Sequence, residues 1–324
     1  APKPLHEQRA AFHWHGASFH NALRHAEALP EALRPLLAPL ALHERFVQAD
    51  FLKDMAKAAQ APQDRAAIDR LLGVLETAGL AHPHGQGIYG LHPALTGFLR
   101  ARGCGQAPAD ESWRRAFVDV MGSLADYFAP KPLHEQRAAF HWHGASFHNA
   151  LRHAEALGMD DDVAAITQAL AAYALNHRDF ANARRYFEKR AEHAKARSEP
   201  GLEASAYHQL GIIAQAQRDF AQARQWYLKA LAITEKQGNE HGVAITYQAL
   251  GALAGIQQHY IESGQWTLKA IRGYVNSQDP HYAQQTVGNF LLAYKQAPPA
   301  DQATLKSLWN QAGLGAFPGE GEEG

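Results

Sequence analysis

The most regular pattern of hydrophobic and polar positions lies between residues 179 and 298, where the chain repeats itself every 40 residues. A polar pair followed by an aromatic residue recurs at that spacing, in 178–180, 218–220 and 258–260. Each copy predicts two helices, because apolar residues fall at helical spacing and polar breaks follow near 197, 237 and 277. Since the breaks are short, the paired helices should be antiparallel. A fixed period of this size predicts a mainly α fold, an α-solenoid of helical hairpins.

The residues of the second copy carry a family resemblance. Ala-Tyr-His-Gln-Leu-Gly at 206–211 is followed by Arg-Asp-Phe-Ala-Gln-Ala at 218–223, then by Tyr227 and Ala230. This pattern closely resembles a tetratricopeptide repeat in a form with longer helices. HEAT and armadillo arrays have similar periods, but the Leu-Gly pair and the Ala-(x)3-Tyr spacing favour the tetratricopeptide repeat. The third copy departs from the pattern at Ser263 and Thr267, as expected of a terminal repeat that stacks on one side only.

The resemblance implies that the inner helix of each pair lines a concave groove that binds a protein or peptide. The groove positions predicted from the register are Gln168, Ser205, His208, Ile212, Gln215, Ile245, Gln248 and Gln285. They are neutral polar or apolar, whereas a groove for a peptide carboxylate would carry Lys and Arg. We therefore expect recognition by amide hydrogen bonds and packing, with Gln168, His208 and Gln248 as a ladder. The alternative is that these are ordinary solvated positions of a scaffold.

Residues 30–103 predict a separate small domain. Helices are expected from Pro30, over 46–59 and over 63–77, followed by a β-hairpin around Gly85-Gln86-Gly87 and a further helix from Pro93. Three helices and a hairpin predict a winged helix. The third helix carries three acidic residues against two basic ones, which disfavours DNA binding because phosphate attraction needs net positive charge.

A winged helix with Tyr-Gly-Leu-His-Pro at 89–93, followed by a helical linker and repeats, resembles the C-terminal half of the signal-transducing NTPases with numerous domains, which include NLR-like sensors and bacterial regulators. The resemblance implies that the winged helix packs on a nucleotide-binding domain and that His92 can reach bound ADP. The alternative is that His92 only caps the next helix. Leu-His-Pro departs from the Met-His-Asp form of some relatives.

The 324 residues contain no Gly-(x)4-Gly-Lys-Ser/Thr phosphate loop. We therefore expect no cofactor and no enzymatic activity from this chain, and a nucleotide-binding domain upstream in the parent protein. Residues 104–158 are predicted to be a helical linker with a capping half-repeat, 159–314 the repeat solenoid, and 315–324 a flexible, low-complexity tail.

Residues 1–29 are identical to 129–157, without a single substitution. Natural duplications diverge, so this identity favours an engineered origin or a borrowed sequence, with a recent tandem duplication as the alternative. The first copy could occupy the equivalent place in a neighbouring chain, which predicts possible self-association through residues 1–29.

Composition adds limits to the predicted function. A net charge of −1 gives no general attraction to nucleic acid or to anionic lipid. No apolar run approaches the ~20 residues of a membrane span, and the single Cys104 fits a reducing cytoplasm. The chain has 20 histidines, but His13 and His15, like His141 and His143, are two residues apart and point to different sides of a helix, which disfavours a metal site.

Trp226 and Trp266 follow Tyr186 at the same register and are expected to pack between outer helices, which is favoured over a ligand box. Together these patterns favour a non-enzymatic sensor module, in which the repeats bind a protein trigger and the winged helix passes the event to a nucleotide domain. The alternatives are a tetratricopeptide scaffold without a switch and, less favoured, a winged-helix transcriptional regulator.

Overall fold

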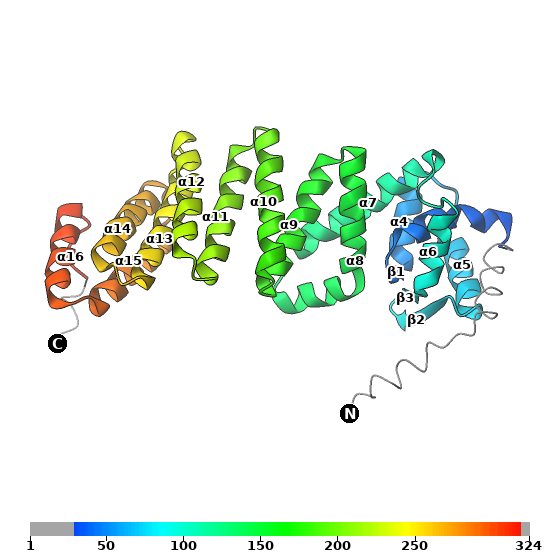
Figure 1. Cartoon of the computed structure of the whole chain (residues 1–324), viewed down its shortest axis with the longest axis horizontal. Coiled ribbons are helices and arrows are strands. Elements are labelled where there is room, and N and C mark those ends of the chain that lie inside the picture. Colours follow the sequence, from blue (N-terminus) through cyan, green and yellow to red (C-terminus); the bar gives the residue numbers. More distant parts are fainter. Residues whose placement is uncertain (1–28, 319–324) are drawn as a thin grey trace, which may run out of the picture. The chain divides into compact units, whose positions relative to one another are not determined.

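The computed structural model describes residues 29–318 of the chain. They form two compact units that divide between Tyr173 and Ala174. Figure 1 labels the helices and strands of each unit. The predicted first copy of the duplicated segment, with His13 and His15, lies outside the described residues, and so do the last six residues of the tail. The predicted segment boundaries at 30–103, 104–158 and 159–314 stay predictions.

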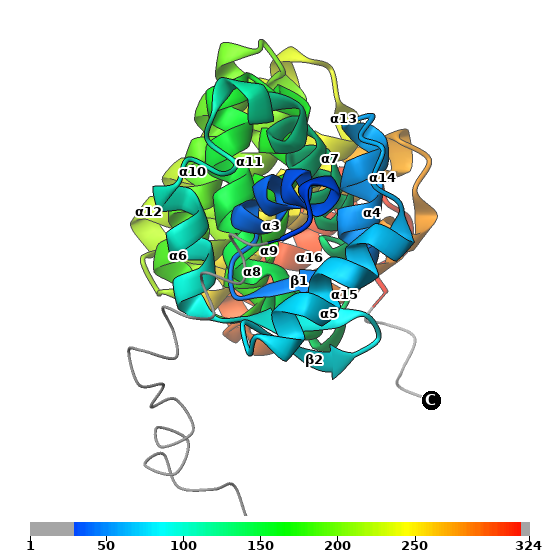
Figure 2. The same cartoon turned by 90° about the vertical axis from the view of Figure 1, so that its right-hand side faces the viewer.

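Unit 1 begins with a group of short helices around a small sheet. Its first elements are η1 (Glu31–Leu36), α3 (Leu37–Leu42), β1 (Phe46–Gln48), α4 (Ala49–Ala58), α5 (Arg65–Thr77), β2 (Ala81–Gly85), β3 (Ile88–Leu91) and α6 (Pro93–Ala101). The sheet is antiparallel with the order β1-β3-β2, and α5 lies beside β2 (Figure 2). Apolar side chains of the helices form the core, among them Leu36, Leu52, Leu71 and Leu95. The expected three helices and hairpin are therefore present.

The turn of the hairpin follows the Gly-Gln-Gly prediction. Gly85, Gln86 and Gly87 have φ of +88°, +51° and +74°, a conformation that glycine adopts without steric cost. The prediction of a helix over 46–59 was wrong at its start, because Phe46–Gln48 form β1. Val47 pairs with Tyr89 of β3, so this segment finds backbone partners on a strand that lies more than forty residues away in the sequence.

Longer helices complete unit 1. After η2 (Pro108–Asp110) come α7 (Glu111–Phe128), α8 (Leu133–Leu157) and α9 (Asp160–Asn176), in which the boundary between the units falls. Helix α7 packs against α8 and α4 and buries Trp113, Phe117 and Met121. Residues 133–157 form a single long helix.

Unit 2 is an array of helices of equal length. They are α10 (Phe180–Ala196), α11 (Pro200–Ala216), α12 (Phe220–Lys236), α13 (Glu240–Ile256), α14 (Tyr260–Asn276) and α15 (Pro280–Gln296), closed by α16 (Pro299–Ala312). From α10 to α15, each helix packs against the next one along the chain. The predicted 40-residue period thus consists of two 20-residue halves, and the mainly α fold with an α-solenoid after a small hairpin domain is confirmed.

One turn recurs at every 20-residue step. After each of the helices α9 to α14, the residue two positions beyond the helix end has positive φ: Arg178, Ser198, Arg218, Gly238, Gln258 and Gln278. Gly158, directly after α8, has positive φ as well. At Arg218 the backbone N–H bonds to Gln215 O at 3.0 Å, and the N–H of Asp219 bonds to Ala214 O at 2.9 Å. This is the pair of bonds of a Schellman motif, which satisfies carbonyl groups at the helix end.

The same three-residue turn also begins the next helix. Asp219 Oδ1 accepts a hydrogen bond from Gln222 N at 3.0 Å, and Asn239 Oδ1 accepts one from Gly242 N at 2.9 Å. Such N-caps satisfy backbone donors that have no partner inside the helix. Because one turn both ends and starts a helix, successive helices follow without further linker residues.

The end of the array differs from the expectation of a flexible tail from residue 315. The Phe317 side chain is only 5% exposed and packs with Phe290 and Trp309. Trp309 Nε1 also donates a hydrogen bond to Gly315 O at 3.1 Å. The residues up to Phe317 are therefore ordered by packing on the aromatic cluster at the end of the array.

Candidate functional site

Seven of the eight predicted groove positions lie on alternate helices of unit 2. Helix α11 carries Ser205, His208, Ile212 and Gln215; α13 carries Ile245 and Gln248; and α15 carries Gln285. The eighth, Gln168, lies on α9 in unit 1. When α11 is paired with α12, α13 with α14 and α15 with α16, each of these three is the first helix of its pair, and it is the helix that the register assigned to the inner row.

A pocket of about 370 Å³ lies between α11 and α13, with the C-terminal half of α12 as its floor. It brings together three of the predicted residues, Ser205, His208 and Ile245. The remaining lining residues are Gly201, Ala204, Gln209, Ala230, Thr234, Asn239, Gly242 and Thr246. No Asp, Glu, Lys or Arg is among them, so the pocket is electrically neutral apart from any charge on His208.

Small residues open this pocket. Gly201 has no side chain, and a β-carbon added there would meet only one atom within 4 Å, Gln237 Nε2 at 3.9 Å. A β-carbon added at Gly242 would lie 2.9 Å from Asn239 Nδ2, so the space directly beside Gly242 is taken. The hydroxyl of Thr234 bonds back to its own helix, to Leu231 O at 3.0 Å. The Thr234 methyl Cγ2 instead points toward Gly242, where an added β-carbon would lie 3.1 Å away. The α12 side of the pocket is therefore lined by the small side chains of Ala230 and Thr234.

His208 is the polar group of the pocket. Its ring lies 5.3 Å from the ring of Tyr227, and its Nδ1 is buried without a hydrogen-bond partner among the described residues. Burial lowers the pKa of His208, because removal from water disfavours the charged imidazolium. At neutral pH the ring is neutral and offers one donor and one acceptor nitrogen.

Two other predicted groove residues are held by tyrosines of the array itself. Tyr227 donates a hydrogen bond from its hydroxyl to Gln215 Oε1 at 3.0 Å, and Tyr274 donates one to Gln248 Oε1 at 2.7 Å. Burial raises the pKa of Tyr274 to about 12, so its hydroxyl stays protonated and remains a donor. Gln285 is exposed and Ile212 packs against the core. The role of these residues in binding, including the proposed ladder, stays a prediction.

The pocket residues that come from α12 and from the turn before α13 were not predicted from the sequence. Thr234, Asn239 and Gly242 do not lie on the groove register. A signal was present, however, because the residues 40 positions later are Tyr274 for Thr234 and Tyr282 for Gly242. A loss of two large side chains at one junction between repeats indicates a hollow there.

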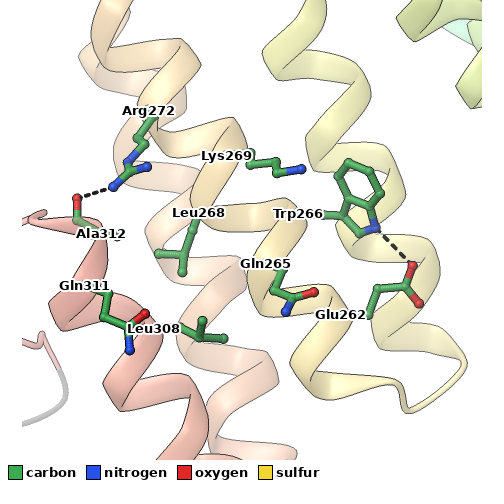
Figure 3. Close-up of a pocket in the computed structure, with 9 residues that line it drawn as sticks. All are labelled: Glu262, Gln265, Trp266, Leu268, Lys269, Arg272, Leu308, Gln311 and Ala312. Atoms are coloured by element: carbon green, nitrogen blue, oxygen red, sulfur yellow. Dashed lines mark hydrogen bonds between the residues drawn. The ribbon is translucent and has the colours of Figure 1, made fainter.

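A second hollow, of about 680 Å³, lies between α14 and α16 (Figure 3). Trp266 donates a hydrogen bond from Nε1 to Glu262 Oε1 at 3.1 Å, and Arg272 donates one from Nη2 to Ala312 O at 2.7 Å. The Lys269 ammonium lies 4.5 Å from the centre of the Trp266 ring. These polar groups bind one another, and none of the predicted groove positions lines this hollow.

The aromatic residues Trp226 and Trp266 were expected to pack between outer helices, and this stays a prediction. Trp226 stacks on Tyr207 with ring centres 5.4 Å apart, and Trp266 stacks on Tyr247 at 5.5 Å. Each tryptophan therefore packs on the first helix of its own pair. Helical register alone places these residues at equivalent positions but does not tell which neighbouring helix they face.

The remaining candidate residues lie in unit 1. His92 is the N-cap of α6, and its Nδ1 accepts a hydrogen bond from Ala94 N at 3.3 Å. A contact with ADP stays a prediction. His143 is buried with its ring 5.0 Å from Phe51, and the ring of His141 lies 4.6 Å from that of Trp142. Burial raises the pKa of the Cys104 thiol, which makes it a weak nucleophile.

Between residues 29 and 318, no three His, Cys, Asp or Glu side chains come together in a way that could hold a metal ion. Over the same residues, no helix combines the length and the hydropathy that crossing a bilayer requires.

Comparison with known proteins identifies the repeats. No curated protein sequence matches this chain. Among solved structures, BtubC (BKLC) from P. vanneervenii is similar, with 21% sequence identity and a TM-score of 0.49 over 66% of this chain and 84% of that chain. A signal transduction ATPase with numerous domains and a tetratricopeptide repeat sensor, from Pyrococcus horikoshii, is similar with 12% identity and a TM-score of 0.44 over 88% of this chain.

The match to the Pyrococcus protein spans 57% of that chain's length. The family model described as tetratricopeptide repeat matches residues 202–274, which include α12 and α13 and most of α11 and α14. All lining residues of the pocket between α11 and α13 except Gly201 lie within this matched segment. Residues 202–274 therefore match tetratricopeptide repeats, as the pattern at 206–230 predicted.

Proposed function

We propose that unit 2 binds a protein or peptide partner through the pocket between α11 and α13 and the groove positions beside it. Tetratricopeptide repeats form interaction modules whose stacked helices offer an extended surface to other proteins. The observation that carries the proposal is the meeting of Ser205, His208 and Ile245 at one open pocket. Ile245, with 36% of its surface exposed, offers apolar contact at the rim, and His208 offers a nitrogen without a partner.

This role is binding and not catalysis. Stacked repeats of this family are interaction scaffolds, and His208 is the one titratable side chain among the residues that line the pocket. A single neutral imidazole can orient a ligand by hydrogen bonding. Partners with a dense charge have no counter-charge in the pocket, so we expect a largely neutral segment.

The proposal is tested by selecting peptides from a random 12-residue display library on the full chain and measuring their affinity for two variants. Ile245→Glu places a charge at the pocket rim and should weaken binding at least tenfold, because a buried unpaired charge is costly. Leu228→Glu is the matched control, since Leu228 is 40% exposed on α12 and does not line the pocket. Equal affinities for both variants, or a library that yields no binder, would contradict the proposal.

A second function is favoured by the element order of unit 1. We propose that this unit is a winged helix that works with a nucleotide-binding domain of the parent protein and passes on partner binding as a switch. The support is the order helix, strand, helix, helix, hairpin, together with the position of His92 where β3 meets α6. The alternative is a scaffold that assembles complexes without a switch.

The switch is tested on the parent gene and protein. A phosphate-binding loop encoded upstream of Pro30 is expected. In that parent protein, His92→Ala should release ADP faster, whereas His134→Ala on the exposed side of α8 should not. A reading frame without such a loop would favour the scaffold. We also propose a cytoplasmic location, supported by the single Cys104 in the sequence.

A further inference from the structure

Two consecutive junctions between first helices are equivalent by the 40-residue period, yet one is hollow and the other is filled. The hollow junction joins α11 to α13 and contains the pocket. The filled junction joins α13 to α15. Each pocket residue has its counterpart 40 positions later, so the filled junction indicates what kind of group fits the hollow one.

In the filled junction, a tyrosine of the protein occupies the space. Tyr274 comes from α14 and is fully buried. Its ring stacks on Tyr282 with ring centres 5.5 Å apart and receives the edge of His241 at 5.5 Å. Its hydroxyl donates a hydrogen bond to Gln248 Oε1 at 2.7 Å. The buried phenol ring of Tyr274 thus has its hydroxyl hydrogen-bonded to a residue of α13.

In the hollow junction, the three aromatic rings are missing. Thr234 stands in place of Tyr274, Gly242 in place of Tyr282, and Gly201 in place of His241. The acceptor position is still polar, because His208 stands in place of Gln248. Its Nδ1 is buried and has no partner among the described residues, which is costly unless a ligand supplies one.

We propose that this pocket receives a tyrosine side chain of the polypeptide partner, whose hydroxyl donates a hydrogen bond to His208. The inference rests on the proposed function and adds the identity of the anchoring residue. The ring would lie over Thr234 and between the two glycines, where the protein's own rings lie in the next junction.

The size and the charge of the pocket agree with this occupant. An engineered cavity of roughly 150 Å³ holds benzene, so about 370 Å³ leaves room for a phenol and part of its backbone. The lining has no cationic side chain, which disfavours a phosphorylated tyrosine or an acidic residue. Ser205 and Asn239 lie among the lining residues and offer polar contacts to the ligand backbone.

The protonation state of the imidazole also agrees. Because burial lowers the pKa of His208, the ring is neutral near pH 7 and one nitrogen can accept a hydrogen bond. Tyr227 is the titratable side chain in ring contact with His208, and its own hydroxyl is bound to Gln215. A phenol from a partner would therefore meet a free acceptor and not a competing donor.

The first experiment uses N-acetyl-L-tyrosinamide and N-acetyl-L-phenylalaninamide as probes on the full chain. Their binding is followed by the NMR shifts of the His208 imidazole and of the backbone amides of Thr234 and Ile245. Tyrosinamide should give saturable shifts and bind about fivefold more tightly, the size expected of one hydrogen bond. In His208→Leu this preference should vanish, whereas in His208→Gln, which copies the next junction, it should remain.

The second variant fills the pocket from inside. Thr234→Tyr copies the residue of the next junction and should abolish binding of both probes. Lys236→Tyr adds the same side chain two positions away on the exposed surface of α12 and should leave binding unchanged. If neither probe shifts His208, or if both variants bind the probes equally well, the inference is overturned.

Peptides selected from the display library separate this inference from the proposed function. Enrichment of tyrosine in peptides that bind the wild-type chain at least tenfold more tightly than Thr234→Tyr supports the inference. Peptides that bind both proteins equally, without tyrosine, would leave a partner-binding array but overturn the tyrosine pocket. The amide probes do not depend on peptide selection, so they test the pocket even if no peptide binds.

Discussion

Gly211 on α11 lies where no β-carbon fits. An added Cβ would lie 2.4 Å from Cε1 of Tyr227, and Tyr227 is buried and bound to Gln215. We predict that Gly211→Ala lowers the free energy of unfolding by about 1–2 kcal/mol, because the overpacking cost exceeds the better helix propensity of alanine. Urea unfolding followed by circular dichroism measures it.

The control for this prediction is Gly288→Ala on α15. Nothing lies within 4 Å of a β-carbon added there, so alanine should raise the free energy of unfolding by up to about 1 kcal/mol. If both variants shift the urea midpoint in the same direction, the close approach of Tyr227 is not what selects glycine at 211.

At the scale of the elements, the recurring turn carries conformational strain that can be measured. Arg218 has φ of +62°, which costs a residue with a β-carbon about 1 kcal/mol. We predict that Arg218→Gly raises the free energy of unfolding by about that amount. The adjacent Gln217 has φ of −82°, so Gln217→Gly should lower it by a similar amount.

Thermal and urea unfolding of the two glycine variants distinguish these effects. Gly238 already occupies the same position of the next turn, with φ of +66°, and shows that the turn accepts glycine. Should Arg218→Gly destabilise the chain, its side chain would have to make contacts that outweigh the backbone strain.

The sheet of unit 1 is another property of elements and not of single residues. Phe46 and Val47 have the apolar character of the helix that follows, and their spacing agrees with a helix face. They form a strand because β3 offers backbone partners to Phe46, Val47 and Gln48. Local spacing could not supply this, since the pairing depends on where the chain returns forty residues later.

At the scale of the whole molecule, the two units differ in their buried histidines. In unit 1, burial lowers the pKa of His43 to about 3 and that of His143 to about 4. The unfolded chain binds protons at these residues below pH ~6.5, while the folded chain does not. The stability of unit 1 is therefore complete above pH 6.5 and falls as the pH decreases toward 4, by about 1.4 kcal/mol per pH unit for each residue.

Amide hydrogen exchange at pH 7 and pH 5.5, corrected for intrinsic rates, measures this loss in peptides from α4, α7 and α8. His143→Leu should reduce the pH dependence by about one proton, because the leucine cannot titrate. Peptides of unit 2 far from His208 serve as the internal reference. An unchanged pH dependence in His143→Leu would show that His143 titrates normally in the folded chain.

The positions of the helices of the array, and of the short breaks between them, could be predicted from the sequence alone. Their signals are local: an apolar period along each helix, a residue in the left-handed conformation, and a capping Asp or Asn directly after it, as in Arg218-Asp219. Hydrogen bonds within a few residues satisfy these groups, so the 40-residue period predicts the elements without knowledge of their neighbours. The groove register on α11, α13 and α15 follows from the same periodicity.

The position of the pocket that a ligand could enter is visible only in the folded chain. Whether space remains between α11 and α13 depends on side-chain volumes from three helices. The small side chain of Thr234 leaves a pocket there, whereas Tyr274 fills the equivalent space in the next copy. The same holds for the tyrosines that bind Gln215 and Gln248 and for the strand at Phe46. Packing and long-range pairing join residues far apart in the chain, so their outcome cannot be read from the spacing of either partner alone.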